Sequence, residues 1–368
     1  LNVAIKNGRD AIVRLLLDKG AQIEDCEEKD WTFLHRAAQG GHIGIVSLLL
    51  ERGVNITARA EQQTTPLMIA AYNSREDIVR LLIEKGAPVE DCDQHGWTAL
   101  HFTAVNGHLG IASLLIERGA SVAARAIHQH TPLTIAAKNG RENLLCLLLD
   151  KGAHIEECNF DGATALHLVA QAGHSSIARL LLKRGASIAA QTKYRQTSLT
   201  IAARYGREDI VRLLLLQGAH IEECDGSGWT SLHFAAVLQN PGIARLLLEW
   251  GASITVRGAH QSTPLTMAAF NSREDTVRLL LDKGADIEDC NEGGYTSLHR
   301  AASCGYFSTV SLLLERGANV NAVNIAYRTP LHIAAQFGYI HIIRLLVDRG
   351  SALEARDEDG GTPLYLAV

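Results

Sequence analysis

A Thr-x-Leu triplet returns along the chain every 33 residues, with no insertion between copies. A fixed period of about 20 to 50 residues is typical of a repeat protein, in which each unit buries its apolar face against its neighbours. At 368 residues the chain also exceeds the size at which single cores stop growing. The threonines of the triplets are Thr32, Thr65, Thr98, Thr131, Thr164, Thr197, Thr230, Thr263, Thr296, Thr329 and Thr362.

This spacing predicts one continuous array over residues 1–368. Its parts are a first unit at 1–31, ten full 33-residue units over 32–361, and the start of a further unit at 362–368. Because the sequence begins and ends inside a helical pattern, we expect the array to continue at both ends in the parent protein.

The unit at 98–130 indicates two short helices followed by a turn. Thr98 can cap a first helix that contains Leu100 and ends at Gly107. Apolar residues at helical spacing then resume up to Gly119, where a turn-rich, extended stretch follows. Each unit is therefore predicted to be a helix-turn-helix with a projecting turn.

The motif Thr329-Pro330-Leu331-His332-Ile333-Ala334-Ala335, followed by Gly338, Leu345-Leu346 and Gly350, resembles the ankyrin repeat consensus. This resemblance implies an all-α, ankyrin-repeat solenoid of helix-turn-helix units with projecting β-hairpin turns and a concave binding surface. It also implies that the histidine after the triplet is structural and hydrogen-bonds between turns; it recurs as His35, His101, His167, His233, His299 and His332.

A second period of 66 residues lies on the first. Arg75-Glu76-Asp77 recurs as Arg207-Glu208-Asp209 and Arg273-Glu274-Asp275, which indicates that the duplicated element was a pair of repeats. The unit at 230–262 departs from the repeat because it carries Gln239-Asn240-Pro241 where other units carry a Gly-His-like pair between their two helices. We therefore expect a distorted turn between the helices of this unit.

The cysteines also follow the 66-residue period, at Cys26, Cys92, Cys158, Cys224 and Cys290. Packed helices lie about 10 Å apart, so cysteines two repeats apart are far beyond disulfide reach. We interpret them as reduced thiols at the base of the turns and expect an intracellular, cytoplasmic protein.

No pattern in the chain points to catalysis. His154-Ile155-Glu156-Glu157-Cys158 could suggest metal ligands, but its sister copies carry Gln22, Pro88 and Asp286 in place of the histidine, so no ligand set repeats. Gly226-Ser227-Gly228 lacks the strand and the third glycine of a dinucleotide fingerprint. We therefore predict a non-enzymatic chain with no catalytic, cofactor or metal site.

Charge and hydropathy exclude two further classes of partner. The formal net charge is −5, and Lys and Arg alternate with acids, so no stripe for nucleic acid forms. No apolar run is long enough to span a bilayer, so we expect no membrane contact by these residues. Glu90-Asp91 is expected to pair with Arg59 or Arg125 between repeats, and Glu288-Asp289 with Arg257.

Candidate partner-binding residues are those that the copies do not share. Aromatic residues can anchor an interface, and the residue before the threonine is aromatic in one set of units: Trp31, Trp97, Trp229 and Tyr295, with Ala163 breaking the row. A packing role along the hairpin is the alternative for this row. The more divergent candidates are Tyr72, Val105, Lys138, Arg204, Tyr205, Phe270 and Phe337 in first helices, and His128, His130, Tyr194 and Tyr327 in turns.

These residues favour a non-catalytic scaffold that binds a protein partner on the concave face. Two alternatives stay open: a structural or elastic spacer in a larger protein, and a sensor array of a signalling receptor whose enzymatic domain lies elsewhere. Trp250 stands where most sister units carry Lys or Arg, and is either a secondary contact or an accident of the surface.

Overall fold

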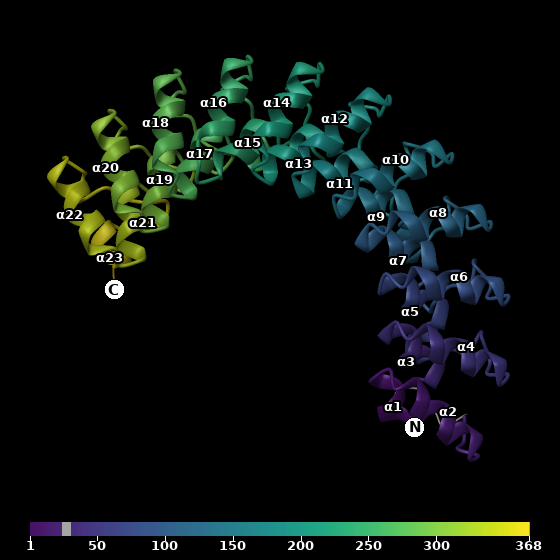
Figure 1. The fold of residues 1–368 in the computed structure, drawn as a ribbon. Coiled ribbons are helices and arrows are strands. Elements are labelled where there is room, and N and C mark those ends of the chain that lie inside the picture. Colours follow the sequence, from purple (N-terminus) through teal and green to yellow (C-terminus); the bar gives the residue numbers. More distant parts are fainter. Residues whose placement is uncertain (24–30, 368) are drawn as a thin grey trace. The chain divides into compact units, whose positions relative to one another are not determined.

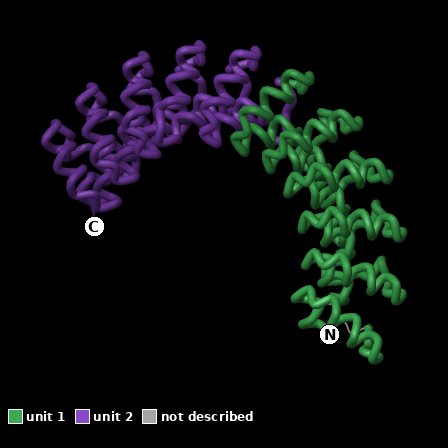
Figure 2. Tube along the Cα trace, viewed as in Figure 1, with its two compact units in different colours: residues 1–187 green, residues 188–368 purple. Residues whose placement is uncertain are grey.

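The computed structural model describes residues 1–23 and 31–367, and the chain divides into two compact units, residues 1–187 and 188–368 (Figure 2). Both units are built from short helix pairs, one pair to a repeat, as predicted. We call the helix that begins after the threonine the first helix and its successor the second helix. In Figure 1 the first helices carry odd numbers and the second helices even numbers.

In unit 1, first helices pack in one row and second helices in another (Figure 1). The first helices are α1 (Asn2–Lys6), α3 (Phe33–Gly40), α5 (Pro66–Tyr72), α7 (Ala99–Asn106), α9 (Pro132–Lys138) and α11 (Ala165–Ala172). The second helices are α2 (Asp10–Asp18), α4 (Ile43–Glu51), α6 (Glu76–Glu84), α8 (Leu109–Glu117), α10 (Glu142–Asp150) and α12 (Ser175–Lys183). Short 3-10 turns η2 (Glu61–Gln63) and η3 (Ile127–Gln129) lie in the loops.

Unit 2 repeats this arrangement. Its first helices are α13 (Ser198–Arg204), α15 (Ser231–Ala236), α17 (Pro264–Phe270), α19 (Ser297–Ser303), α21 (Pro330–Gln336) and α23 (Pro363–Leu366). Its second helices are α14 (Glu208–Leu216), α16 (Gly242–Glu249), α18 (Glu274–Asp282), α20 (Phe307–Glu315) and α22 (Ile340–Asp348), and η4 (Ala259–Gln261) is a 3-10 turn. Leu265, Leu298 and Leu331 of successive first helices share one apolar core with Leu280 and Leu313 of the second helices.

The threonine of each triplet caps its first helix, as predicted. In the unit at 98–130, the Thr98 amide donates to Nδ1 of His101 at 3.1 Å, and the two side chains lie 2.9 Å apart. Where the sister unit carries Thr134 in place of histidine, the Thr131 amide donates to its hydroxyl at 2.9 Å. The helix α7 ends on Gly107, whose φ of 82° needs the left-handed conformation that glycine adopts at low cost.

A basic residue at the start of several second helices ties the helix to the preceding repeat. Nε of Arg75, Arg141 and Arg273 donates to the carbonyl oxygens of Gln39, Val105 and Val237 at 3.2, 3.0 and 2.7 Å. His42 and His174 place Nε2 3.3 Å from the carbonyl oxygens of Lys6 and Lys138. This contact explains why the Arg-Glu-Asp motif returns with the repeat, since the orphan carbonyls at a helix end need donors.

The hairpins are less regular than the sequence suggested. In the described residues they form isolated antiparallel bridges instead of strands, as between Cys92 and Thr98. Their tips are linked by backbone hydrogen bonds to the next repeat: the Gln94 amide donates to the Gln62 carbonyl at 2.9 Å, and the Glu292 amide to the His260 carbonyl at 2.9 Å. The backbone groups that lack a strand partner are thus satisfied along the row of tips.

The irregular repeat at 230–262 is distorted, as predicted. Helix α15 ends at Ala236 and α16 begins at Gly242, so five residues separate them, whereas two residues separate α11 from α12. Pro241 stands at the cap of α16, and the Asn240 side chain accepts a hydrogen bond from the Gly242 amide at 2.9 Å. Without the left-handed glycine, the first helix ends early.

Candidate functional site

Exposed aromatic side chains gather on the ends of the first helices and on the hairpins. We call this surface the first-helix face. Tyr72, Tyr205, Phe270 and Phe337 lie at the ends of first helices and are 41 to 54% exposed. Phe160, Tyr194 and Tyr327 lie in hairpins and are also exposed. Among the described residues, Trp250 and Phe307 are the exposed aromatic side chains of the second-helix row, and Tyr365 lies on α23.

The aromatic residues that directly precede the capping threonines are less exposed than residues of a free binding surface would be. Trp31, Trp97, Trp229 and Tyr295 are half-buried, and their rings lie 5.8 to 6.0 Å from the imidazole of the histidine four residues further along the chain. Trp97 and Trp229 also pack against Phe102 and Phe234, at 5.4 and 5.3 Å between ring centroids. These contacts favour the packing interpretation, and a binding role for the row stays a prediction.

The remaining predicted residues lie on the same face with different exposure. Val105 and His130 are half-buried, whereas His128, Lys138 and Arg204 are exposed. His128 stands at a hairpin tip with a φ of 57°, and its carbonyl accepts the Phe160 amide at 2.6 Å. Phe160 was missed in the sequence because its repeat position carries no other aromatic residue.

The buried histidines of the first helices link each repeat to the next hairpin. Nδ1 of His299 accepts from the Thr296 amide at 3.3 Å, so the hydrogen is on Nε2, which lies 3.0 Å from the Arg328 carbonyl oxygen. Burial lowers the pKa of His101 and of His299 to about 4, although the carbonyl contacts act in the opposite direction. The rings are therefore neutral and structural, as the resemblance implied.

The carboxylates beside the cysteines also hold repeats together. Glu90, Glu156, Glu222 and Glu288 each accept a hydrogen bond at 2.7 Å from a backbone amide of the next repeat. The predicted ion pairs are present, with Arg59 3.3 Å from Asp91 and Arg257 2.7 Å from Asp289. Glu156, which could have suggested a metal ligand, thus holds the next repeat, and no group of three ligating side chains occurs in the described part of the chain.

The cysteines lie at the base of the hairpins, as expected. Cys158, Cys224 and Cys290 are half-buried and Cys92 is exposed; all four are free thiols. Their backbones bridge to the threonine of the next repeat, and Arg59 donates to the Cys92 carbonyl at 2.8 Å. Cys26 lies outside the described residues.

Arginine residues stack on the aromatic rings of the first-helix face. The guanidinium of Arg300 on α19 lies 5.1 Å from the Phe270 ring centroid and 5.5 Å from that of Tyr295. Arg204 at the end of α13 lies 5.7 Å from the Phe234 ring. Arg300 was not singled out in the sequence, although the signal was available: most sister units carry Ile, Phe or Leu at its position.

A hollow of about 500 Å³ opens beside Arg300. Tyr295, Arg300 and Phe337 line it together with the hairpin residues His260 and Glu292. First helices and hairpins therefore contribute to one site in unit 2, and the structure brings two of the predicted binding residues, Tyr295 and Phe337, into it.

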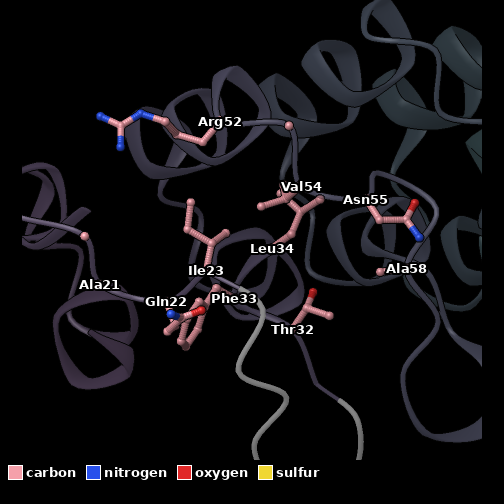
Figure 3. A pocket seen from close by; sticks show the side chains of 12 residues that line it. Ala21, Gln22, Ile23, Thr32, Phe33, Leu34, Arg52, Val54, Asn55 and Ala58 are labelled. Atoms are coloured by element: carbon pink, nitrogen blue, oxygen red, sulfur yellow. The ribbon is translucent and has the colours of Figure 1, made fainter. Parts of the chain in front are cut away.

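Another hollow, of about 570 Å³, lies beside α3 and α4 (Figure 3). The side chains of Ile23, Leu34 and Val54 line it, and Arg52 points away from them. Residues 24–30, which connect Ile23 to Trp31, lie outside the described part of the chain, so we assign no ligand to this hollow.

Trp250 replaces one member of a repeated ion pair. At the ends of second helices, Arg184 lies 2.8 Å from Asp150 and Arg316 lies 2.7 Å from Asp282. At the same two positions α14 and α16 offer Leu216 and Trp250, which are 62 and 44% exposed. An apolar pair thus stands where other repeats place charges.

No helix within the described residues has the length and apolar character needed to cross a membrane.

Comparison with known families covers nearly the whole chain. A family described as ankyrin repeats in three copies matches residues 1–60, 59–126, 85–157, 123–192, 188–258 and 257–324. A second family, ankyrin repeats in many copies, matches residues 305–347. No curated protein matches the chain significantly.

Proposed function

Because the chain belongs to the ankyrin-repeat family, we propose that it is a non-catalytic scaffold that binds a protein partner on its first-helix face, the concave face expected from the sequence. Ankyrin repeats are in general protein–protein interaction modules, and proteins built from them are typically not enzymes. The partner and the surface that it uses are the proposal.

The observation that carries this proposal is the uneven distribution of exposed aromatic side chains. Aromatic residues dominate interface hot spots because they bury a large area at low conformational cost. Tyr205, Phe270 and Phe337 project from the ends of α13, α17 and α21, which are alternate first helices of unit 2, and Tyr72 does so in unit 1. Several sister repeats carry Gln or Asn at these positions, as at Gln39 and Gln171 and at Asn106 and Asn139, so the fold does not require the rings.

The polar residues of the sister repeats provide a variant that should fold. In this variant Tyr72 and Phe270 become Gln, as in Gln39 and Gln171, and Tyr205 and Phe337 become Asn, as in Asn106 and Asn139. Asn suits this position because the side chain of Asn139 donates to the Ile135 carbonyl at 2.9 Å.

The test is capture of partners from a cytosolic extract by the immobilised chain, with identification by mass spectrometry. We expect proteins that the native chain retains and the four-residue variant loses, while circular dichroism shows the same helix content in both. Equal capture by both chains would contradict binding through these rings. Capture of no protein would favour the spacer hypothesis.

A further inference from the structure

The guanidinium of Arg300 lies against two aromatic rings and has no acidic partner among the residues that the structure describes. It is half-buried and stacked near Phe270 and Tyr295. Within the described part of the chain no carboxylate lies at ion-pair distance from it, whereas Arg257 and Arg316 of the same unit each reach an aspartate. A partly buried cation is normally paired. Stacking leaves the N–H edge of the guanidinium for a ligand, and a carboxylate matches that edge with two hydrogen bonds.

The other arginine that lines the hollow already has an acidic partner. Arg328 donates from Nε to Asp357 at 3.1 Å, and Asp357 is almost fully buried. Glu292 is the one carboxylate that lines the hollow, and its Oε1 lies 2.5 Å from Nδ1 of His260 at the hairpin tip. Arg300 is therefore the arginine of the hollow that has no carboxylate at ion-pair distance among the described residues, and it lies next to the exposed ring of Phe337.

Charge is distributed unevenly between the two helix rows. The described first helices contain no Asp or Glu, and their cations are Lys6, Arg36, Lys138, Arg204 and Arg300. Every second helix except α12 contains at least one acid. Although the chain has a net charge of −5, its first helices are basic and aromatic, which favours an acidic ligand on this face.

A second arginine–aromatic pair lies in the same unit. Arg204 lies 5.7 Å from the Phe234 ring, and no carboxylate is within ion-pair distance of it among the described residues. The two pairs lie two repeats apart, and the arginine and the ring exchange places between them: Arg204 ends α13 and contacts a ring of α15, whereas Arg300 lies on α19 and contacts the ring that ends α17. Packed helices are spaced by about 10 Å, so the two guanidinium groups are expected about 20 Å apart. An extended peptide covers this distance in about six residues.

We propose, building on the proposed function, that unit 2 binds an extended acidic segment of its partner protein. One Asp or Glu of the segment pairs with Arg300, a neighbouring aromatic or large aliphatic side chain enters the hollow against Phe337, and a second acid about six residues away pairs with Arg204. A nucleic acid is disfavoured because isolated guanidinium groups, with Glu292 between hairpins, do not form a stripe of cations along a backbone.

The sister repeats supply variants that remove each guanidinium without disturbing the fold. Arg300→Leu reproduces Leu168, and Arg204→Gln reproduces Gln171. The matched control is Arg212→Ser with Arg245→Ser, which removes the same charge from the second helices and reproduces Ser47 and Ser113. Thermal unfolding and circular dichroism are used to check that the native chain and all variants are folded.

The probe is a displayed library of random peptides of about 16 residues, long enough to span both arginines. Peptides selected on the full chain are synthesised with a fluorescent label and measured by anisotropy. We expect selected sequences with two acids about six residues apart. We also expect binding about tenfold weaker to the Arg204→Gln/Arg300→Leu variant, unchanged binding to the control, and weaker binding as NaCl rises.

The outcomes separate this inference from the proposed function. Selected peptides that lack acids and bind the Arg204→Gln/Arg300→Leu variant normally, yet lose binding when Phe337 is replaced by Asn, would overturn the acidic segment and leave the proposed function standing. Peptides insensitive to every change on the first-helix face, or no selected peptide at all, would contradict both. An oligothymidylate that displaces the acidic peptides and binds more tightly would assign the arginines to nucleic acid instead.

Discussion

Acidification from about pH 7 to about pH 5 should destabilise the protein through the buried histidines of its first helices. His101 and His299 are fully buried, and burial brings their pKa values from 6.5 to about 4. The unfolded chain therefore binds more protons than the folded chain between pH 6.5 and about 4. Stability is complete above the unfolded pKa, falls as the pH drops through this window, and changes no further below it for these groups.

The magnitude follows from the width of the window. At about pH 5 each ring lies about 1.5 pH units below its unfolded pKa, which corresponds to a loss of about 2 kcal/mol for each histidine. His101 and His299 together account for about 4 kcal/mol of the free energy of unfolding. His35 and His233 also have pKa values lowered by burial, so they add to the loss in the same direction.

The assay compares urea unfolding at the two pH values, followed by circular dichroism, for the native chain and for His101→Thr with His299→Thr. Thr134 occupies the same position in a sister repeat and keeps the threonine cap, so the variant should fold. It should be less stable at pH 7, because the contacts of the two rings with backbone carbonyl groups are lost, yet lose about 4 kcal/mol less on acidification. An equal pH-dependent loss in both chains would refute the reasoning. His128→Gln, at an exposed hairpin tip, is the control and should behave like the native chain.

Three further predictions concern single features of the repeats. Ser198→Pro should raise the free energy of unfolding by about 1 kcal/mol. The buried Ser198 hydroxyl has no partner among the described residues, and proline suits the first position of a helix. A lower urea midpoint for the variant would contradict this. Replacing Gln239-Asn240-Pro241 by the Gly-His-Ser of residues 173–175 should extend α15 and add about 1 kcal/mol, and unchanged helix content and midpoint would count against it. Leu216→Asp with Trp250→Arg should change the free energy of unfolding by less than about 1 kcal/mol and weaken retention of the protein on a hydrophobic column. If urea titration shows that the free energy of unfolding falls by several kcal/mol, the apolar pair is a packing contact.

The repeated features of the fold were predictable from the sequence because each is set by a few local residues. Thr98 and Gly107 mark the two ends of a helix through capping chemistry that needs no knowledge of the rest of the chain. The break at Gln239-Asn240-Pro241 was predictable for the same reason.

Contacts between repeats were harder to predict. The period of the Arg-Glu-Asp motif was visible, but the bond from Arg141 Nε to the Val105 carbonyl joins residues 36 positions apart, and neither residue suggests the other. The bond from the Ser253 amide to Glu222 is of the same kind.

The candidate site was predicted only in part. Tyr72, Phe270 and Phe337 were identified because they differ from their sister residues, and they are exposed. Trp97 was identified from its residue type, but the sequence does not reveal that it packs against Phe102 and His101. Arg300 was missed although most sister units carry an apolar residue at its position, because the sequence does not reveal the two rings beside it.

Photo-crosslinking from matched phenylalanine positions tests the first-helix face most directly. Phe337 follows α21 on that face and is 54% exposed, whereas Phe307 begins α20 in the second-helix row and is 48% exposed. Benzoylphenylalanine is placed at one position or the other, and the full chain is irradiated in a cytosolic extract. Our account predicts a crosslinked protein from position 337 that is absent from position 307. A partner crosslinked from 307 and not from 337, or from neither, would contradict binding through the first-helix face.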